Sequence, residues 1–198
     1  MLTEKQKEKV WDAARICFKE NGYEKMSLKA VAQSSGVKIE KIKEDYPTKK
    51  KLIKDLMSNG IDHVTHLLEK SIRSKGKTDV KISRFVKNLL RDYEIHAPLF
   101  KLVSMNFETL DEEHLKLRNL LTQEQISRYR RNTVILGRLI AKGQSEGLFR
   151  KADPLECAFY LRGIIHGAIR YWAATNYEGN LSDFADKVMR TFLTGIYK

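Results

Sequence analysis

The sequence contains no apolar run long enough to cross a membrane, and its 198 residues include only two cysteines. A membrane-spanning helix needs roughly 18 consecutive apolar residues, and a signal peptide needs an apolar core where this chain begins with charged residues. We therefore expect a cytoplasmic protein with no membrane partner. Cys17 and Cys157 stand far apart, each within an apolar helical stripe rather than a metal-binding pattern, which indicates buried free thiols.

Two short motifs of the common enzyme classes are also missing. The chain has no phosphate-binding glycine loop and no HExxH. His63 and His66 lie three residues apart, which can place two metal ligands on one helix face, but no third ligand has a matching spacing. We predict that the protein is not an enzyme and has no catalytic site, metal site or cofactor.

Segments with the alternation of a half-buried β-strand are absent as well. Apolar residues recur at helical spacing along the whole chain, so we expect an all-α protein of about nine helices. The first helix begins at a capping box formed by Thr3 and Gln6. It ends near Gly22, because glycine readily takes the left-handed conformation that closes a helix.

Positive charge is in excess. Lysine and arginine number 37 against 25 acidic residues, a net charge of +12. An excess of this size favours contact with a polyanion or with an acidic membrane surface. The first 55 residues share it, with 14 basic and 9 acidic side chains and a net charge of +5.

Two short helices follow the first, over about residues 28–34 and 38–45. Ser27 is a favourable cap for the earlier one, and Pro47 stops the later one. Together the three helices make one amino-terminal unit.

The spacing between the two short helices is typical of a helix-turn-helix. Two helices that cross steeply need a small residue at the crossing and a turn residue that tolerates positive φ. Ala32 and Gly36 stand four residues apart and meet both demands, and Val31, Val37 and Ile42 supply inward apolar contacts. The sequence therefore predicts a helix-turn-helix DNA-binding domain over residues 1–47.

The rest of the chain, residues 48–198, is expected to form a larger helical domain. Its first element is a long helix over residues 48–73, which connects the two domains. Further along, Gly147 ends one helix, and Asp153 caps the next.

The stretch VWDAARICFKENGYEKMSLKAVAQSSGV, followed by DYPTKKKL, resembles the DNA-binding domain of TetR/AcrR-type transcriptional regulators. The resemblance covers about the first quarter of the chain. The matching positions are Ala13, Ala14, Phe18, Gly22, Ser27, Val31, Ala32, Gly36, Val37, Tyr46, Lys49 and Leu52.

This resemblance implies a homodimer that binds a palindromic operator on double-stranded DNA. The carboxy-terminal domains would pair and hold a pocket for a small-molecule effector, apolar or aromatic in character, that releases a repressor from its operator. The alternative is a helical adaptor that keeps the fold but binds a protein partner.

The third helix departs from the pattern of the family. Where the family usually has Ser or Thr, then Gly, Tyr and His, this chain has Lys38, Glu40, Lys43 and Asp45. Glu40 can pair with Lys43 and Lys41 with Asp45, or Glu40 can accept a hydrogen bond from a cytosine amino group, or the face can be plain solvated surface. The predicted DNA-binding residues are Ser27, Lys29, Lys38, Glu40, Lys41, Lys43 and Lys49.

Two further groups of residues are candidates for binding. Apolar side chains of the middle region, with one histidine inside an apolar helix, form either a ligand pocket or ordinary core. These are Tyr93, Phe100, Met105, Phe107, Tyr129 and His166.

The helix after Asp153 and a last helix over about 182–197 have broad apolar faces, which predicts an isologous four-helix dimer interface. Its candidate residues are Phe159, Gly163, Gly167, Phe184, Val188 and Phe192.

Overall fold

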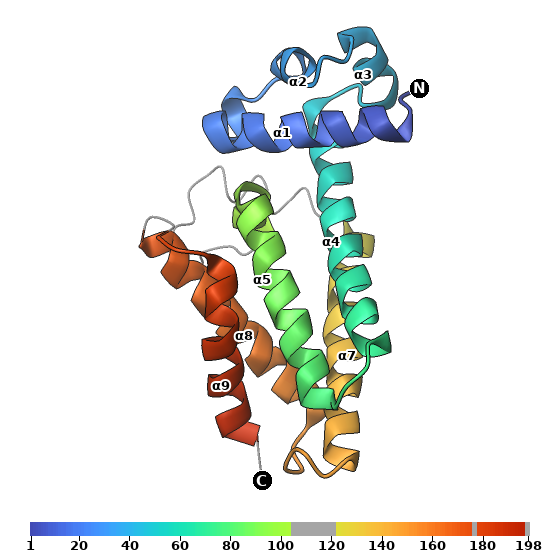
Figure 1. Cartoon of the computed structure of the whole chain (residues 1–198). Coiled ribbons are helices and arrows are strands. Elements are labelled where there is room, and N and C mark those ends of the chain that lie inside the picture. Colours follow the sequence, from blue (N-terminus) through green and yellow to red (C-terminus); the bar gives the residue numbers. More distant parts are fainter. Residues whose placement is uncertain (104–121, 176–177, 197–198) are drawn as a thin grey trace. The chain divides into compact units, whose positions relative to one another are not determined.

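A computed structural model describes residues 1–103, 122–175 and 178–196 (Figure 1). The chain divides into two compact units, one containing Met1–Gly60 and the other containing Ile61–Ile95 and Glu124–Lys198. Within the described ranges both units are built from helices, with no β-strand. The predicted all-α fold is confirmed.

The first unit contains the three predicted helices and the beginning of a fourth. These are α1 (Glu4–Lys25), α2 (Leu28–Ser35), α3 (Ile39–Asp45) and α4 (Lys49–Arg73). The capping box of Thr3 and Gln6 is present. Gly22 has a φ of 69°, but helical residues resume beyond this kink and α1 ends at Lys25 rather than at the glycine.

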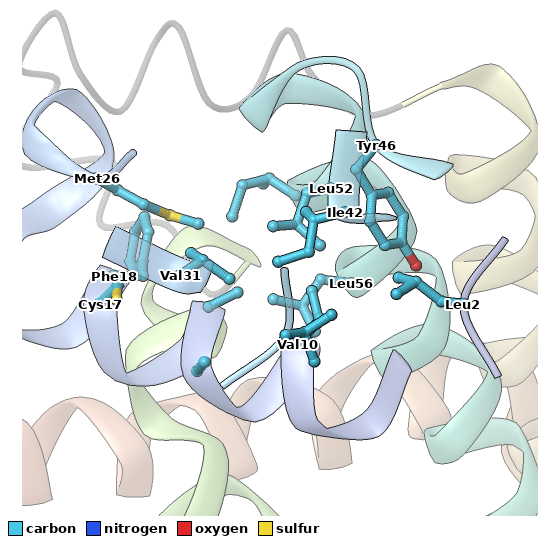
Figure 2. Packing of buried hydrophobic residues seen from close by; sticks show 14 of the residues in the cluster. Leu2, Val10, Cys17, Phe18, Met26, Val31, Ile42, Tyr46, Leu52 and Leu56 are labelled. Atoms are coloured by element: carbon cyan, nitrogen blue, oxygen red, sulfur yellow. The ribbon is translucent and has the colours of Figure 1, made fainter. Parts of the chain in front are cut away.

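The apolar faces of these four helices meet in one core (Figure 2). Val10 comes from α1, Val31 from α2, Ile42 from α3 and Leu52 from α4, and each is fully buried. The third helix is therefore held by its inward residue, which leaves its opposite face for other contacts. Leu2, ahead of the first helix, also lies in this core.

The second unit contains the rest of α4 and the helices that follow. They are α5 (Thr78–Val103), which belongs to this unit as far as Ile95, α7 (Gln123–Ser145), α8 (Pro154–Ala174), a short 3-10 helix η1 (Leu181–Phe184) and α9 (Ala185–Ile196). Within this unit α8 and α9 lie against each other (Figure 1). The last helix was predicted to start at about residue 182, but its first turn is the tighter 3-10 form.

The connection from α7 to α8 follows the predicted signals. Gly147 has a φ of 72° just after α7 ends. Asp153 caps α8 by accepting a hydrogen bond from the backbone N–H of Glu156 at 2.8 Å, and Pro154 occupies the first turn. The backbone N–H groups of Leu148 and Phe149 both donate to the carbonyl of Gly143, which folds the loop back onto the helix end.

The two cysteines are buried free thiols, as predicted. Burial raises the pKa of both thiols. Across the ranges that the structure describes, no helix combines the length and the hydropathy of a membrane span. No group of three or more potential metal ligands occurs there either, and His63 instead lies against the carboxylate of Asp92.

Candidate nucleic-acid interface

The turn between α2 and α3 is fixed by short-range hydrogen bonds. Ser27 caps α2 by accepting from the backbone N–H of Ala30 at 3.1 Å. Gly36 closes the helix with a φ of 68°, and its N–H donates to the carbonyl of Ala32. The hydroxyl of Ser35, which the sequence did not single out, accepts from the N–H of Val37 at 3.2 Å. The angle between the two helices is thus set locally.

One face of α3 is anchored and the other is exposed. Ile42 is fully buried and Tyr46, just after the helix, is 2% exposed. The Tyr46 hydroxyl accepts a hydrogen bond from Trp11 Nε1 at 3.1 Å, which ties α3 to α1. The opposite face carries charged residues: Lys38, Glu40, Lys41, Lys43 and Glu44 are all exposed.

The acidic residues at the end of α3 have partners that the sequence did not indicate. The carboxylate of Asp45 accepts from the backbone N–H of Leu2 at 2.8 Å, and Glu44 forms an ion pair with the amino group of Met1. The pair of Lys41 with Asp45, one of the alternatives that the spacing allowed, is not formed in the part of the chain described. Asp45 is half-buried beside a fixed backbone donor, which competes well with a flexible lysine on the surface.

The remaining predicted DNA-binding residues on α2 and α3 form what we call the recognition surface. They are Lys29, Lys38, Glu40, Lys41 and Lys43. All five side chains are exposed. None of them forms an ion pair within the described ranges, so the pair of Glu40 with Lys43 that the spacing allowed is also absent there. Four cations and one carboxylate therefore face solvent without being neutralised by the protein itself.

Lys49, predicted to contact a phosphate, has a different place. Its Nζ donates to the carbonyl oxygens of Tyr23 at 2.7 Å and Glu24 at 3.0 Å, and lies 4.4 Å from the centroid of the Tyr23 ring. Those carbonyls belong to the last turn of α1, where the helix dipole attracts a cation. Lys49 thus fastens the start of α4 to the end of α1.

Replacing Lys49 with methionine should therefore lower stability. We expect the free energy of unfolding to fall by about 1 kcal/mol, because two helix-end carbonyls lose a charged donor. Urea denaturation followed by circular dichroism measures this. The neighbouring Lys50 is exposed, so Lys50→Met is the matched control and should leave stability unchanged. Equal midpoints for the two variants would show that the contacts of Lys49 add nothing.

Three of the predicted pocket residues gather in the second unit around Arg162. The guanidinium lies 3.9 Å from the centroid of the Tyr129 ring, and its Nη1 donates to the hydroxyl of Thr133. The Tyr129 hydroxyl is 3.5 Å from His166 Nε2, and Tyr93 is 6% exposed. We call these five side chains the polar cluster.

The electrostatics of the polar cluster follow from burial. Burial lowers the pKa of His166 to about 4, helped by the positive charges of Arg162 and Arg170, so the imidazole is neutral at pH 7. Burial also raises the pKa of Tyr93 and lowers that of Arg162. Arg162 stands one helical turn before His166, but neither it nor Thr133 was among the predicted pocket residues.

The other predicted pocket residues cannot be placed around this cluster. Met105 and Phe107 lie outside the described residues. Phe100 belongs to α5, and its side chain is likewise outside the description.

The predicted dimer residues divide into two groups. Phe159 is 56% exposed, and a Cβ added at Gly163 or Gly167 would meet no atom within 4 Å. Val188 and Phe192 are each 3% exposed. Those two side chains belong to the core of the second unit and offer almost no surface to a partner, and Phe184 is half-buried beside Tyr171.

Comparison with known proteins places the fold. No family model matches the sequence, and no curated protein matches it. Solved structures do. The transcriptional regulator FadR from Bacillus subtilis, in complex with stearoyl-CoA, is 19% identical, with a TM-score of 0.76 over 96% of this chain and 99% of that one.

Two further solved structures are similar to this chain over almost its whole length. The fatty acid degradation regulator FadR from Bacillus halodurans is 16% identical, with a TM-score of 0.77 over 98% of both chains. A putative TetR-family transcriptional regulator from Mesorhizobium loti is 16% identical, with a TM-score of 0.70 over the whole of both chains. The chain has the fold of TetR-type regulators along its whole length, as the resemblance of its first quarter implied.

Proposed function

We propose that the protein is a transcriptional regulator that binds a palindromic operator as a homodimer and acts as a repressor released by a small-molecule effector. The observation that carries this proposal is the recognition surface. Buried Ile42 and Tyr46 fix α3, while four lysines with no acidic partner in the described chain stand on its exposed side and on α2. This is how a helix-turn-helix presents its second helix to the major groove.

The lysines and Glu40 have different roles in this proposal. Lysine side chains bind phosphates by charge and set the position of the helix on the duplex. A carboxylate repels phosphate but accepts a hydrogen bond from the amino group of cytosine in the major groove. Glu40 is therefore the residue that reads a base, and the lysines supply affinity.

Selection of bound duplexes from a random DNA pool tests the proposal, followed by affinity measurements at several salt concentrations. We expect an enriched palindrome. With four lysines in each subunit, about eight phosphate contacts would weaken binding by about 10³ to 10⁵ between roughly 50 and 200 mM salt. No enrichment, together with salt-insensitive binding, would favour the adaptor, whose supporting observation is the set of acidic residues on α3.

Replacing Glu40 with glutamine should change the preferred operator rather than the overall affinity. The amide both donates and accepts, and glutamine prefers adenine, so we expect one position of each half-site to change and the original site to bind about tenfold or more weakly. Lys43→Gln is the control, since loss of a phosphate contact should weaken all sequences alike. An unchanged preferred site would make Glu40 plain surface.

Dimerisation and effector response are the other parts of the proposal. The exposed stripe of α8, with Phe159 beside Gly163 and Gly167, offers an apolar surface that a second copy can approach closely. A monomeric mass at micromolar concentration would refute the dimer. Since α4 contributes to both units, we infer that effector binding shifts the operator-competent population through this helix.

Acyl-CoA is a rational first effector to test. The FadR structure from Bacillus subtilis holds stearoyl-CoA, and this chain shares its fold. Operator affinity with and without saturating ligand is the measurement. An unchanged affinity for every ligand shown to bind would refute coupling between the two units.

A further inference from the structure

Arg162 is a largely buried cation that pairs with no anion among the described residues. On α8 its neighbours Leu161 and Ile165 are buried, and its own side chain is only partly accessible. Its guanidinium stacks on Tyr129 and donates to Thr133, but no carboxylate of the described chain forms an ion pair with it. A guanidinium carries five N–H donors, and buried charges are normally paired. Most of its hydrogen-bonding capacity is therefore unused by the part of the chain that the structure describes.

Further polar side chains lie on the facing helix. Tyr129, Asn132 and Thr133 are spaced i, i+3 and i+4 along α7, which places them on one face. Asn132 is 7% exposed, and its side-chain amide lies 2.9 Å from the hydroxyl of Thr65. Neutral hydrogen-bonding groups are thus buried on the helix that faces Arg162.

The cluster has a single positive charge. His166 is neutral at pH 7, because burial holds its pKa at about 4, and burial raises the pKa of Tyr93, which keeps that hydroxyl neutral as well. A planar guanidinium with neutral donors around it matches one planar carboxylate, which it can bind through two parallel hydrogen bonds. One helical turn away, Leu136 and Ile165 are 2% exposed each, so the surroundings of the cluster are apolar.

We propose that Arg162, together with Tyr129, Thr133 and Asn132 on α7, binds the carboxylate of an organic acid with an apolar body, which rests on the proposed function in taking the second unit as the effector-binding part. Arg162 is the counter-ion of the carboxylate. The hydroxyls and the amide complete its hydrogen bonds, and the apolar part of the acid lies among the aliphatic side chains of the unit.

The inference is tested by adding decanoate to the protein in the absence of DNA. Decan-1-ol, which has the same chain length but no charge, is the control ligand. Thermal unfolding of the full chain should shift upward with decanoate concentration and respond far less to decan-1-ol. In Arg162→Met the decanoate affinity should fall by about 30-fold or more, because a desolvated charge pair is lost. Arg138, exposed on α7, supplies the control, and Arg138→Met should leave the decanoate response unchanged.

The stability of Arg162→Met separates binding from structure. Without ligand it should unfold at the same urea concentration as the wild type or a higher one, because methionine removes an unpaired buried charge. If that variant fails to fold, Arg162→Lys keeps the charge, and its decanoate affinity should still fall at least tenfold because the planar fork is lost. Equal responses to decanoate and decan-1-ol, or an undiminished response in either variant, would overturn the inference.

The experiments distinguish failure of the carboxylate site from failure of the proposed function. Operator selection that succeeds while decanoate has no specific effect leaves a regulator with another effector and removes the carboxylate site. Decanoate binding that depends on Arg162 supports the site even where no operator is selected.

Discussion

Gly143→Ala is expected to lower the free energy of unfolding by about 3 kcal/mol, near the upper end of the usual cost of overpacking. A Cβ at residue 143 would lie 2.2 Å from Cε2 and 2.4 Å from Cδ2 of Phe149. Carbon atoms in contact need about 3.5 Å or more. One of the two residues has to move.

Phe149 has little freedom to move. Its ring is 1% exposed, and its backbone N–H donates to the carbonyl of Gly143, the residue that carries the change. Its neighbour Arg150 donates from its backbone N–H to the carbonyl of Ile196 at 2.8 Å. Burial leaves the ring little space to rotate, and the hydrogen bonds fix the backbone on which it is carried. The added methyl group must therefore displace backbone rather than a flexible side-chain end.

Two controls isolate the clash in urea denaturation. Gly60→Ala, in a helix and with no atom within 4 Å of the added Cβ, should stabilise the protein by about 0.5–1 kcal/mol through helix propensity alone. Phe149→Leu replaces the ring with a shorter aliphatic side chain. Gly143→Ala should therefore lower the free energy of unfolding less in that background than in the wild type. Equal costs in both backgrounds would show that the ring is not the obstacle.

Local chemistry explains why much of the first unit was predictable. The cap at Ser27, the positive φ at Gly36 and the inward place of Ile42 each depend on a few neighbouring residues, and all three appear in the structure. The glycine at position 22 has the positive φ expected there, but its ψ of 177° is not that of the left-handed helical conformation. Periodicity and capping act over four or five residues, which a single sequence displays directly.

The missed features depend on contacts between residues far apart in the chain. Lys49 binds carbonyls some 25 residues earlier, and Asp45 binds the N–H of Leu2. Arg162 faces Thr133 and Tyr129 across two helices. Each of these side chains is charged, so the sequence suggested surface or phosphate. Only the fold shows which polar atoms of the protein itself come within reach.

The polar cluster around Arg162 contributes to the stability of the fold in a way that depends on pH. His166 has a pKa of about 4 in the folded chain, lowered first by burial and then by the charges of Arg162 and Arg170. An unfolded histidine titrates near 6.5. Between about pH 6.5 and 4 the unfolded chain binds a proton that the folded chain does not, so acidification favours unfolding in this window.

The expected loss is about 2 kcal/mol between pH 6.5 and 4, allowing for the partial exposure of the ring. Urea denaturation of the wild type and of His166→Gln across this range measures it. The carboxylates of the chain titrate in both proteins and cancel in the difference. The glutamine keeps a polar group opposite the Tyr129 hydroxyl, so the comparison changes the titrating group and little else.

The difference in unfolding free energy between wild type and His166→Gln should therefore shrink or reverse in favour of glutamine as the pH falls, and be constant above about pH 7. His66 is exposed on α4 in the same unit, and His66→Gln should follow the wild type throughout. Parallel curves for wild type and His166→Gln would mean that the imidazole accepts its proton inside the fold. The room or water needed for that charge would then lie beside Arg162, which argues for an open cluster rather than a dry one.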